Sequence, residues 1–373
     1  MAIQGRKIVV AKKGDLSEIK IILSRNQVRI IKELPLVNAL VVEFPSLSEI
    51  NLLTRGLTDE VSIEDDLDFE LCWLYPWFMP FFPYMPPPQE IKGPSSPIAQ
   101  RRVDWGIKRI GAPEVWDKLK ERRVKVGIID TGIYDKHPDL QDNIKECVST
   151  LDDNSSYLDD NGHGTHVAGI IGANSGPGGM LGVNPYVDFY VVKAFNRKGS
   201  GKLSDIIEGL DWLVRRQVNI INMSFSTSET NSVLDQAIWQ AYARGTILVA
   251  AAGNSGGENT IKYPAKYPEV IAVSATDSSD RLATFSSTGP EVDFCAPGVN
   301  IRSTWLWGAY QQKSGTSFAA PHLAGEVADL LNYYGPMSPR QVRDYLEAGA
   351  VQLEGLAPEQ QGLGLVEIQR IIT

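Results

Sequence analysis

The chain has 373 residues, a net charge of −9 and a hydrophobic content of 43%, so it exceeds the size of one ordinary domain and can bury a large core. An acidic chain of this kind does not suit a nucleic-acid partner, because phosphate binding needs clustered Lys and Arg. The three cysteines are odd in number and lack Cys-x-x-Cys spacing, which predicts neither a disulfide framework nor a zinc site.

Residues 1–70 have the pattern of a small α+β domain. Helical spacing of apolar residues occurs at Leu16–Ser24 and Leu47–Arg55. Strand-like runs occur at Lys7–Val10, Val28–Leu34, Ala39–Phe44 and Val61–Ile63. No long apolar stretch follows Met1, so the sequence shows no secretory signal. It predicts a cytoplasmic protein, with secretion as the alternative if the start is misassigned or export is non-standard.

Residues 71–102 are dominated by aromatic residues and proline. The run is apolar enough to suggest a membrane span, but Pro76, Pro80 and Pro83 would repeatedly break the helix that a span needs. We therefore expect an extended interdomain connector and no membrane span. Exposed aromatic side chains favour association, so some of these are expected to dock on the protein itself.

Residues 103–373 alternate between apolar runs of strand length and amphipathic helical segments. The helices are expected at Leu203–Arg215 and Ser232–Ala243. The strands are expected at Val124–Ile129, Val187–Val192, Val218–Met223, Thr246–Ala251 and Val270–Val273. This alternation predicts βαβ units, and so an α/β domain with a buried parallel sheet and helices on both faces.

Two segments place reactive side chains beside glycines. Asp130 ends an apolar strand in Gly-Ile-Ile-Asp-Thr-Gly, where a carboxylate needs a fixed partner or is simply a turn residue. His163 lies in Asn-Gly-His-Gly-Thr-His, where small neighbours let other groups approach its ring. His166 could join it in a metal site, but no third ligand follows in a fitting pattern, so we expect His166 to be structural.

A third segment, Gly-Thr-Ser317-Phe-Ala-Ala-Pro321-His, predicts a helix that begins near Ser317. Pro321 is expected in the first helical turn, where proline is tolerated. Ser317 could be an ordinary helix cap, or a nucleophile placed where free amides stabilise an oxyanion. Asn254, just past a buried strand in Ala-Ala-Gly-Asn, could donate to the same oxyanion. The order Asp, His, Ser is one known order of the Ser-His-Asp triad.

Together these segments resemble the subtilisin-like serine peptidases over about Val103 to Ala328, and Lys7 to Glu70 more weakly resembles the inhibitory prodomain of that family. The resemblance implies a catalytic domain of subtilisin type at 103–373, a ferredoxin-like prodomain at 1–70, and a maturation site in the connector at 71–102. The motifs that carry it are Gly-Ile-Ile-Asp130-Thr-Gly-Ile, His163-Gly-Thr-His166-Val-Ala-Gly, Ala-Ala-Gly-Asn254, Gly-Thr-Ser317-Phe-Ala-Ala-Pro-His, Ile221-Asn-Met-Ser224 and Tyr263-Pro-Ala-Lys-Tyr-Pro.

The resemblance also implies the chemistry. Ser317 would attack the peptide carbonyl, His163 would transfer the proton, and Asp130 would orient the imidazole. Asn254 and the Ser317 amide would bind the oxyanion, and substrate would bind as an added strand. Large hydrophobic residues are expected before the cleaved bond, although Ser226 stands where the family usually has glycine. The residues expected to flank the substrate are Gly199, Ser200, Gly201, Ser224, Phe225, Ser226, Ala251, Ala252 and Gly253.

No cofactor is expected for the chemistry, and a structural calcium ion is a possibility that the resemblance raises. Asp139 matches a carboxylate of the family's calcium site, but Gly176 stands where a second side-chain ligand is usual and Arg101 at another ligand position. The chain is expected to be a monomer that acts on proteins or peptides and binds its own prodomain. Alignment to the family's prodomain ending puts the maturation cut near Leu71–Tyr75.

Three alternatives remain at this stage. A processing enzyme of narrow specificity would share every motif above. A peptide-binding pseudo-protease would lack a triad member, and none is missing. An ester hydrolase would need a Gly-x-Ser-x-Gly elbow, whereas Ser317 lies in Gly-Thr-Ser-Phe-Ala.

Overall fold

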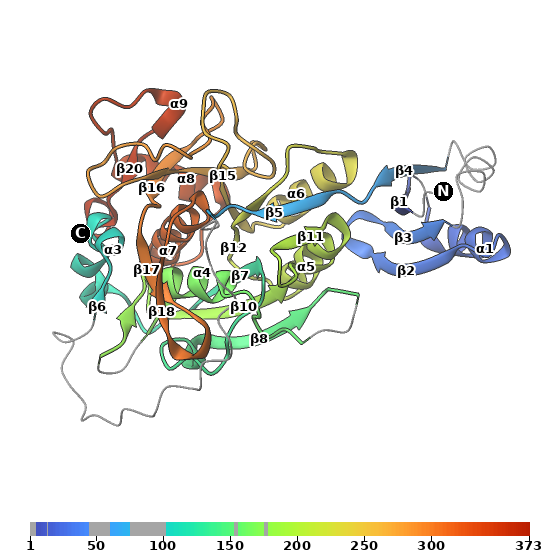
Figure 1. Cartoon of the computed structure of the whole chain (residues 1–373), viewed down its shortest axis with the longest axis horizontal. Helices are drawn as coiled ribbons and strands as arrows, with labels where there is room; N and C mark the ends of the chain where they lie inside the picture. The colour runs from blue at the N-terminus through green and yellow to red at the C-terminus, as the bar shows by residue number, and fades with distance from the viewer. Residues whose placement is uncertain (1–4, 13, 45–59, 75–101, 153–155, 175–177) are drawn as a thin grey trace.

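The computed structural model describes residues 5–12, 14–44, 60–74, 102–152, 156–174 and 178–373. A small α+β unit lies at one end of a larger α/β domain (Figure 1). The expected helix Leu47–Arg55 and most of the connector 71–102 lie outside the described residues. Among the helices that are described, none combines the length and apolarity that crossing a bilayer requires.

The small unit is a four-stranded antiparallel sheet with the order β2-β3-β1-β4, as in a ferredoxin-like domain. Its elements are β1 Gly5–Ala11, α1 Leu16–Arg25, β2 Arg29–Leu34, the short 3-10 helix η1 Pro35–Val37, β3 Ala39–Phe44 and β4 Val61–Asp65. Side chains alternate between its two faces. Val9 and Leu40 pack against α1, whereas Ile8 and Val41 join the core of the larger domain.

In the described part of the larger domain, nine strands form one sheet with the order β19-β20-β16-β15-β14-β12-β7-β10-β8. Neighbours are parallel from β8 to β20, and β19 is antiparallel to β20. Their bounds are β7 Val124–Asp130, β8 Ile144–Ser149, β10 Val187–Lys193, β12 Ile220–Met223, β14 Ile247–Ala251, β15 Val270–Thr276, β16 Phe294–Pro297, β19 Ala350–Val351 and β20 Leu365–Val366.

Helices cover both faces of this sheet. The helices α4 His163–Gly172 and α7 Thr316–Tyr334 lie on one face, and α5 Leu203–Arg215 and α6 Ser232–Ala243 on the other. Along β7, Ile128 faces the first pair and Ile129 the second, which is the alternation of a strand buried on both sides. The expected α/β class with helices on both faces is confirmed.

The remaining described elements lie around this frame. They are β6 Arg102–Val103, α3 Trp105–Arg109, η3 Ala112–Glu114, η4 Trp116–Lys118, η5 Gln141–Asn143, β9 Met180–Leu181, β17 Ile301–Thr304, η6 Leu306–Gly308, β18 Tyr310–Lys313, α8 Pro339–Gly349, α9 Pro358–Gln361 and η7 Ile368–Arg370.

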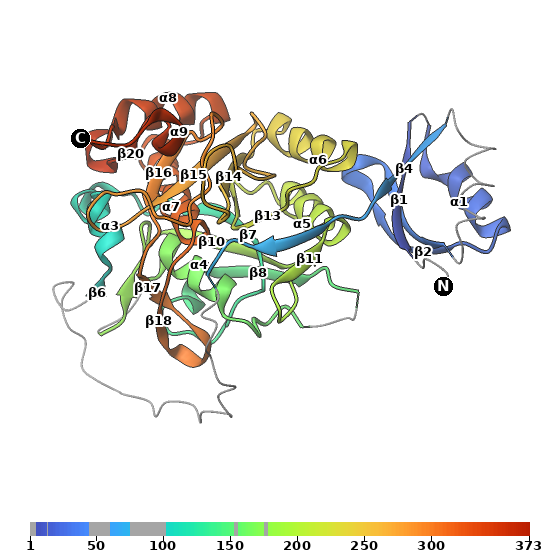
Figure 2. The same ribbon diagram turned by 45° about the horizontal axis from the view of Figure 1, so that its top comes forward.

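Among the strands not expected from the sequence, one lies beside the residues predicted to bind substrate. β5, Asp68–Leu71, leaves the small unit and runs across the larger domain (Figure 2). It pairs antiparallel with β11 Ser200–Lys202 on one side and β13 Phe225–Ser226 on the other. Asp-Phe-Glu-Leu is too short to show a period of its own. Its strand conformation comes from backbone partners more than 100 residues away.

The expected position of Pro321 is wrong. Helix α7 begins at Thr316, so Pro321 is its sixth residue and lies beyond the first turn. Proline lacks the N–H that would bond the Ser317 carbonyl. The hydroxyl of Ser224 donates to that carbonyl instead, at 2.9 Å. The side chain of Ser224, the residue after β12, therefore supplies the hydrogen-bond donor that the Ser317 carbonyl lacks because of the proline.

Candidate active site

Asp130 and His163 form a buried pair at the carboxyl end of the sheet. Asp130 is the last residue of β7, and His163 is the first residue of α4. The Nδ1 atom of His163 lies 2.8 Å and 2.9 Å from the two carboxylate oxygens of Asp130. Both side chains are fully buried. The contact fixes the ring orientation and leaves Nε2 free to exchange a proton with another group.

Asp159 holds these two residues in place and was missed by the sequence analysis. One of its oxygens accepts from the amide of Gly162 and from the hydroxyl of Thr131, and the other accepts from the amide of Thr165. It therefore caps the start of α4 and ties that helix to the turn after Asp130. Burial raises the pKa of Asp159, and these donors oppose the shift.

Ser317 lies in the first turn of α7, fully buried beside the same site. Its hydroxyl donates to the carbonyl of Ser224 at 2.7 Å. Within the described residues the Nε2 atom of His163 has no hydrogen-bond partner. The rings of His163 and Phe318, the residue after Ser317, have centroids 5.3 Å apart. The start of α7 thus contacts the His163 ring through Phe318, while the Ser317 hydroxyl is turned toward Ser224.

The amide of Ser317 donates to the carbonyl of Cys72, and the side chain of Asn254 lies nearby. The Ser317 amide donates to the Cys72 oxygen at 3.0 Å. The Oδ1 atom of Asn254 accepts from the amide and hydroxyl of Thr316, which directs Nδ2 away from α7. That Nδ2 atom is buried and has no partner in the described chain. A Cβ on Gly315 would lie 2.5 Å from the Cys72 oxygen and 3.3 Å from Nδ2, so only glycine fits between them.

Residues 68–74 occupy a groove lined by the residues expected to bind substrate. Ser200 and Gly201 pair with β5 from one side, and Phe225 and Ser226 pair with it from the other. The ladder continues beyond β5, because the Leu71 amide donates to Gly199 at 3.3 Å and the Cys72 amide to Ser224 at 3.2 Å. The Leu74 amide then donates to Ser314 at 3.0 Å. The groove thus makes backbone hydrogen bonds on both sides of the Cys72–Trp73 bond, although the chain bends at these two residues.

Comparison with known proteins decides the family. Residues 121–364 match the family described as the subtilase family. The chain is 45% identical to Subtilisin DY of Bacillus licheniformis over 255 residues, which cover 67% of this chain and 92% of that protein. It is 40% identical to the Thermostable alkaline protease of Halalkalibacterium halodurans over 269 residues, which cover 72% and 73%.

The chain belongs to the subtilase family. It is a subtilisin-like serine endopeptidase. A third relative, the Minor extracellular protease Epr of Bacillus subtilis, is 42% identical over 266 residues, which cover 70% of this chain and 41% of that longer protein.

The groove of this subtilase encloses three side chains of its own N-terminal segment. Phe69 is fully buried, with its ring 5.7 Å from that of Phe225. Trp73 lies 5.6 Å from the His163 ring and 6.2 Å from that of Trp305. The third, Cys72, is buried with its sulfur 3.0 Å from the Ser226 hydroxyl, and burial raises the pKa of its thiol to about 11.

The expected lining residues Ala251, Ala252 and Gly253 are all buried; Ala251 ends β14 and the other two follow it. His166 is buried on the inner side of α4, with Nε2 3.0 Å from the Gln311 carbonyl. Burial lowers the pKa of His166 to about 3, so its ring is neutral. Its surroundings are those of a packing residue.

The described surroundings of Asp139 do not fit a calcium site. One carboxylate oxygen of Asp139 already accepts from the amide of Met180 at 2.9 Å and from the hydroxyl of Tyr310 at 2.7 Å. Calcium needs six or more oxygen ligands, and within the described residues no cluster of three acidic, histidine or cysteine side chains could hold a metal. Gly176 and Arg101 lie outside the described residues. Asp139 therefore meets hydrogen-bond donors where a calcium site would supply further oxygens.

Proposed function

We propose that this chain is the zymogen of an endopeptidase that uses Ser317, His163 and Asp130, and that it first cleaves its own Cys72–Trp73 bond. One observation carries the proposal: the Ser317 amide donates to the Cys72 carbonyl at 3.0 Å, while β5 is paired on both sides in the groove. Donors aimed at a carbonyl oxygen beside a serine at a helix N-terminus are the arrangement that stabilises an oxyanion. The cut lies within the range Leu71–Tyr75 expected from the sequence.

The reaction begins with a rotation of the Ser317 hydroxyl from the Ser224 carbonyl toward Nε2 of His163, which has no other described partner. The serine oxygen then attacks the Cys72 carbonyl carbon as His163 takes the hydroxyl proton. Nδ1 keeps its hydrogen bond to Asp130, which stabilises the imidazolium. Asn254 and the Ser317 amide hold the oxyanion.

Collapse of this intermediate breaks the Cys72–Trp73 bond, and His163 gives its proton to the departing Trp73 amine. Cys72 is then esterified to Ser317. Water, deprotonated by His163, attacks the ester carbonyl, which frees the Cys72 carboxylate and returns the proton to Ser317. The same steps apply to any peptide that takes the place of residues 68–74.

After the cut, the small unit would remain bound as an inhibitor. Its contacts include a buried apolar patch, Leu36 and Val37 of η1, packed against α5 and α6. They also include Lys32, whose ammonium lies 2.6 Å from Asp205 and 2.9 Å from Glu208 on α5. As long as β5 stays paired in the groove, a substrate strand cannot enter.

A matched pair of serine variants tests the proposal. Ser317→Ala in the full chain is expected to abolish both self-cleavage and peptide hydrolysis, with a loss of about 10⁶-fold in kcat, the size of loss known for removal of the nucleophile of subtilisin. Ser278→Ala changes an exposed serine outside the site and should behave as the parent chain does. A Ser317→Ala chain that still processes itself would contradict the proposal.

For the compartment, we propose the secreted alternative. It is supported by one relative, the Minor extracellular protease Epr. Fractionation of cells that express the full chain tests this, with activity expected in the medium. The monomeric state and the preference for large hydrophobic residues before the cleaved bond stay predictions. The predicted preference for hydrophobic residues does not consider the polar side chains of Ser226 and Lys262, which lie beside the pocket.

A further inference from the structure

The position of Cys72 defines the pocket that binds the side chain of the residue before the cleaved bond. Its carbonyl faces the Ser317 amide, and its side chain is fully enclosed. Any substrate that binds in the same backbone register would direct the corresponding side chain to this place. A cysteine side chain is short, so what a longer side chain would meet depends on the groups just beyond the thiol.

One such group is Lys262, which runs along the glycine wall of the pocket. Its amide donates to the Ala252 carbonyl at 3.0 Å. A Cβ on Gly253 would lie 3.3 Å from Cγ and 3.5 Å from Cδ of the lysine. Gly253 has φ +113°, a conformation that side chains rarely adopt. At Gly253 the wall is therefore bare backbone, and the aliphatic part of the Lys262 side chain packs against it.

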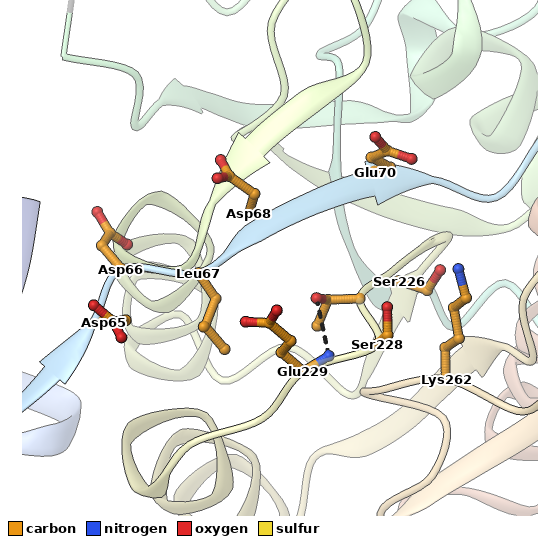
Figure 3. Close-up of a pocket in the computed structure, with 10 residues that line it drawn as sticks. Asp65, Asp66, Leu67, Asp68, Glu70, Ser226, Ser228, Glu229 and Lys262 are labelled. Carbon is orange, nitrogen blue, oxygen red and sulfur yellow. Dashed lines mark hydrogen bonds between the residues drawn. The ribbon is translucent and has the colours of Figure 1, made fainter. Parts of the chain in front are cut away.

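Ser226 and Lys262 line one hollow of about 490 Å³ (Figure 3). The Ser226 hydroxyl is 3.0 Å from the Cys72 sulfur, so it lies at the end of the present side chain. The Lys262 ammonium makes no ion pair or hydrogen bond with any residue that the structure describes. The Lys262 charge nevertheless reaches the pocket, because it lowers the pKa of the buried Cys72 thiol, against the larger effect of burial.

Most of the acidic groups around this hollow belong to the segment that departs. Asp65, Asp66, Asp68 and Glu70 precede the proposed cut, and Glu70 opposes Lys262 in its effect on the Cys72 thiol. Once residues up to Cys72 leave, Lys262 and the exposed Glu229 are the charged side chains that remain in the lining. The hollow, which adjoins the place of the Cys72 side chain at Ser226, then keeps an ammonium and a hydroxyl and loses four carboxylates.

We propose that Lys262 makes this enzyme select substrates with an acidic side chain, glutamate above all, before the cleaved bond. A carboxylate there would gain a charge-assisted hydrogen bond from Lys262 and a second from Ser226. A large hydrophobic side chain would cover the ammonium without pairing it, which costs affinity. The inference rests on the proposed function, because it takes the register of residues 68–74 as that of a substrate. It favours the narrow-specificity alternative over broad specificity.

The neutral Cys72 at the same place is consistent with this selectivity. Self-cleavage is intramolecular, so β5 and its two flanking strands supply the binding that a separate substrate must obtain from its side chains. A residue that satisfies the pocket poorly also leaves it more readily after the cut. The enzyme can therefore process itself after cysteine and still select glutamate in other proteins.

The test uses the self-processed enzyme and four tetrapeptide p-nitroanilides that differ only in the last residue: Glu, Gln, Phe or Leu. For the parent enzyme, kcat/KM for Glu is expected to exceed that for Gln by about 10- to 100-fold, the range of one charge-assisted hydrogen bond in a partly desolvated site. Lys262→Met should bring this ratio near one and raise the rate on Phe, whereas Lys262→Arg should retain the ratio. Lys266→Met, an exposed lysine four residues on, is the matched control.

The outcomes separate the two proposals. Equal Glu-to-Gln ratios in the parent and Lys262→Met, or a parent preference for Phe, would overturn the acidic selectivity while leaving the serine chemistry intact. Self-processing reports folding, because each variant must cut itself to yield the enzyme assayed. If the parent cleaves no substrate and remains unprocessed, the proposed function itself is wrong. A Glu preference that falls as ionic strength rises would support an electrostatic origin.

Discussion

The N-terminal part of this subtilase contacts the catalytic domain in two places that differ in kind. In the groove, β5 uses backbone pairing on both edges and encloses Phe69 and Cys72. On the far side of α5 and α6, the small unit uses η1 and the ion pairs of Lys32. The groove contact contains the bond that we propose reacts, and it includes one exposed ion pair, between Lys202 and Asp68. The helix contact holds the same chain without chemistry and is partly screened by salt.

This difference teaches that cleavage and inhibition can be separated. Breaking the Cys72–Trp73 bond removes the covalent tether of the groove contact and leaves the helix contact unchanged. The small unit then stays until both contacts fail. Substitutions in one contact are therefore expected to affect rates of cleavage, and substitutions in the other the lifetime of the inhibited complex.

After that of Ser317→Ala, the largest effect is expected at the oxyanion. Asn254→Ala removes a buried, unpartnered amide near the Cys72 carbonyl, so self-cleavage should slow by about 10²- to 10³-fold. The rate is measured from the appearance of the processed chain after refolding. The affinity of the small unit should hardly change, and an equal loss in both quantities would contradict the assignment of Asn254.

The next effect is expected from Phe69→Ala, which empties the fully buried pocket against Phe225. Truncating a buried phenylalanine costs about 3–5 kcal/mol, so inhibition of the processed enzyme by the retained small unit should weaken by at least about 10²-fold. The inhibition constant is measured with a chromogenic substrate. Exposed Ile21→Ala on α1 is the control and should leave the constant unchanged.

A smaller and salt-dependent effect is expected at the helix contact. Lys32→Met removes an ammonium that is 12% exposed and bound to Asp205, so the inhibition constant should rise by about 10-fold at low salt. The difference from the parent should shrink in 1 M salt, since screening weakens the lost pair. A Lys32→Met effect on the rate of self-cleavage comparable to that of Asn254→Ala would erase the distinction between the two contacts.

The smallest effect concerns a region that belongs to neither contact. Glu326 and Asp329 are fully buried on α7, and burial raises the pKa of both carboxyls well above their ordinary values. The folded state then binds more protons than the unfolded state, so stability is greatest below the unfolded pKa and falls as pH rises toward the folded pKa. Each group contributes a slope of about 1.4 kcal/mol per pH unit in that window.

Replacing both carboxyls by amides, Glu326→Gln with Asp329→Asn, should flatten this fall in the free energy of unfolding between pH 5 and 9. Urea denaturation in a Ser317→Ala background avoids self-digestion and measures it. A parent protein whose stability does not decline over this range would contradict the raised pKa values.

Much of the fold was predictable because it depends on local pattern. The helices Leu203–Arg215 and Ser232–Ala243 and the strand Ala39–Phe44 have the expected bounds, since amphipathic spacing and apolar runs determine them. The motifs also placed Asp130 and His163 where they meet. The strand order became visible only in the structure, because it depends on which distant segments pair.

The features that were missed depend on partners from far along the chain. β5 has no sequence signal, since its conformation is imposed by Ser200 and Phe225. In the sequence Asp159 has the pattern of a loop aspartate, and only the fold shows that the amides at the start of α4 donate to it. In the sequence Lys262 has the pattern of a surface lysine, and only the fold shows that its side chain packs against Gly253 in the pocket wall. The position of Pro321 in its helix was predicted wrongly, because the Ser224 hydroxyl that bonds the Ser317 carbonyl in place of the missing N–H comes from another part of the chain.

The most direct test of the account is the mass of the two products of the first self-cleavage. Freshly folded protein is sampled over time, quenched in acid and analysed by intact mass spectrometry, with Ser317→Ala as the uncut reference. The account predicts a first fragment that ends at Cys72 and a partner that begins at Trp73. A first cut at any other bond, or the same cut in Ser317→Ala, would contradict it.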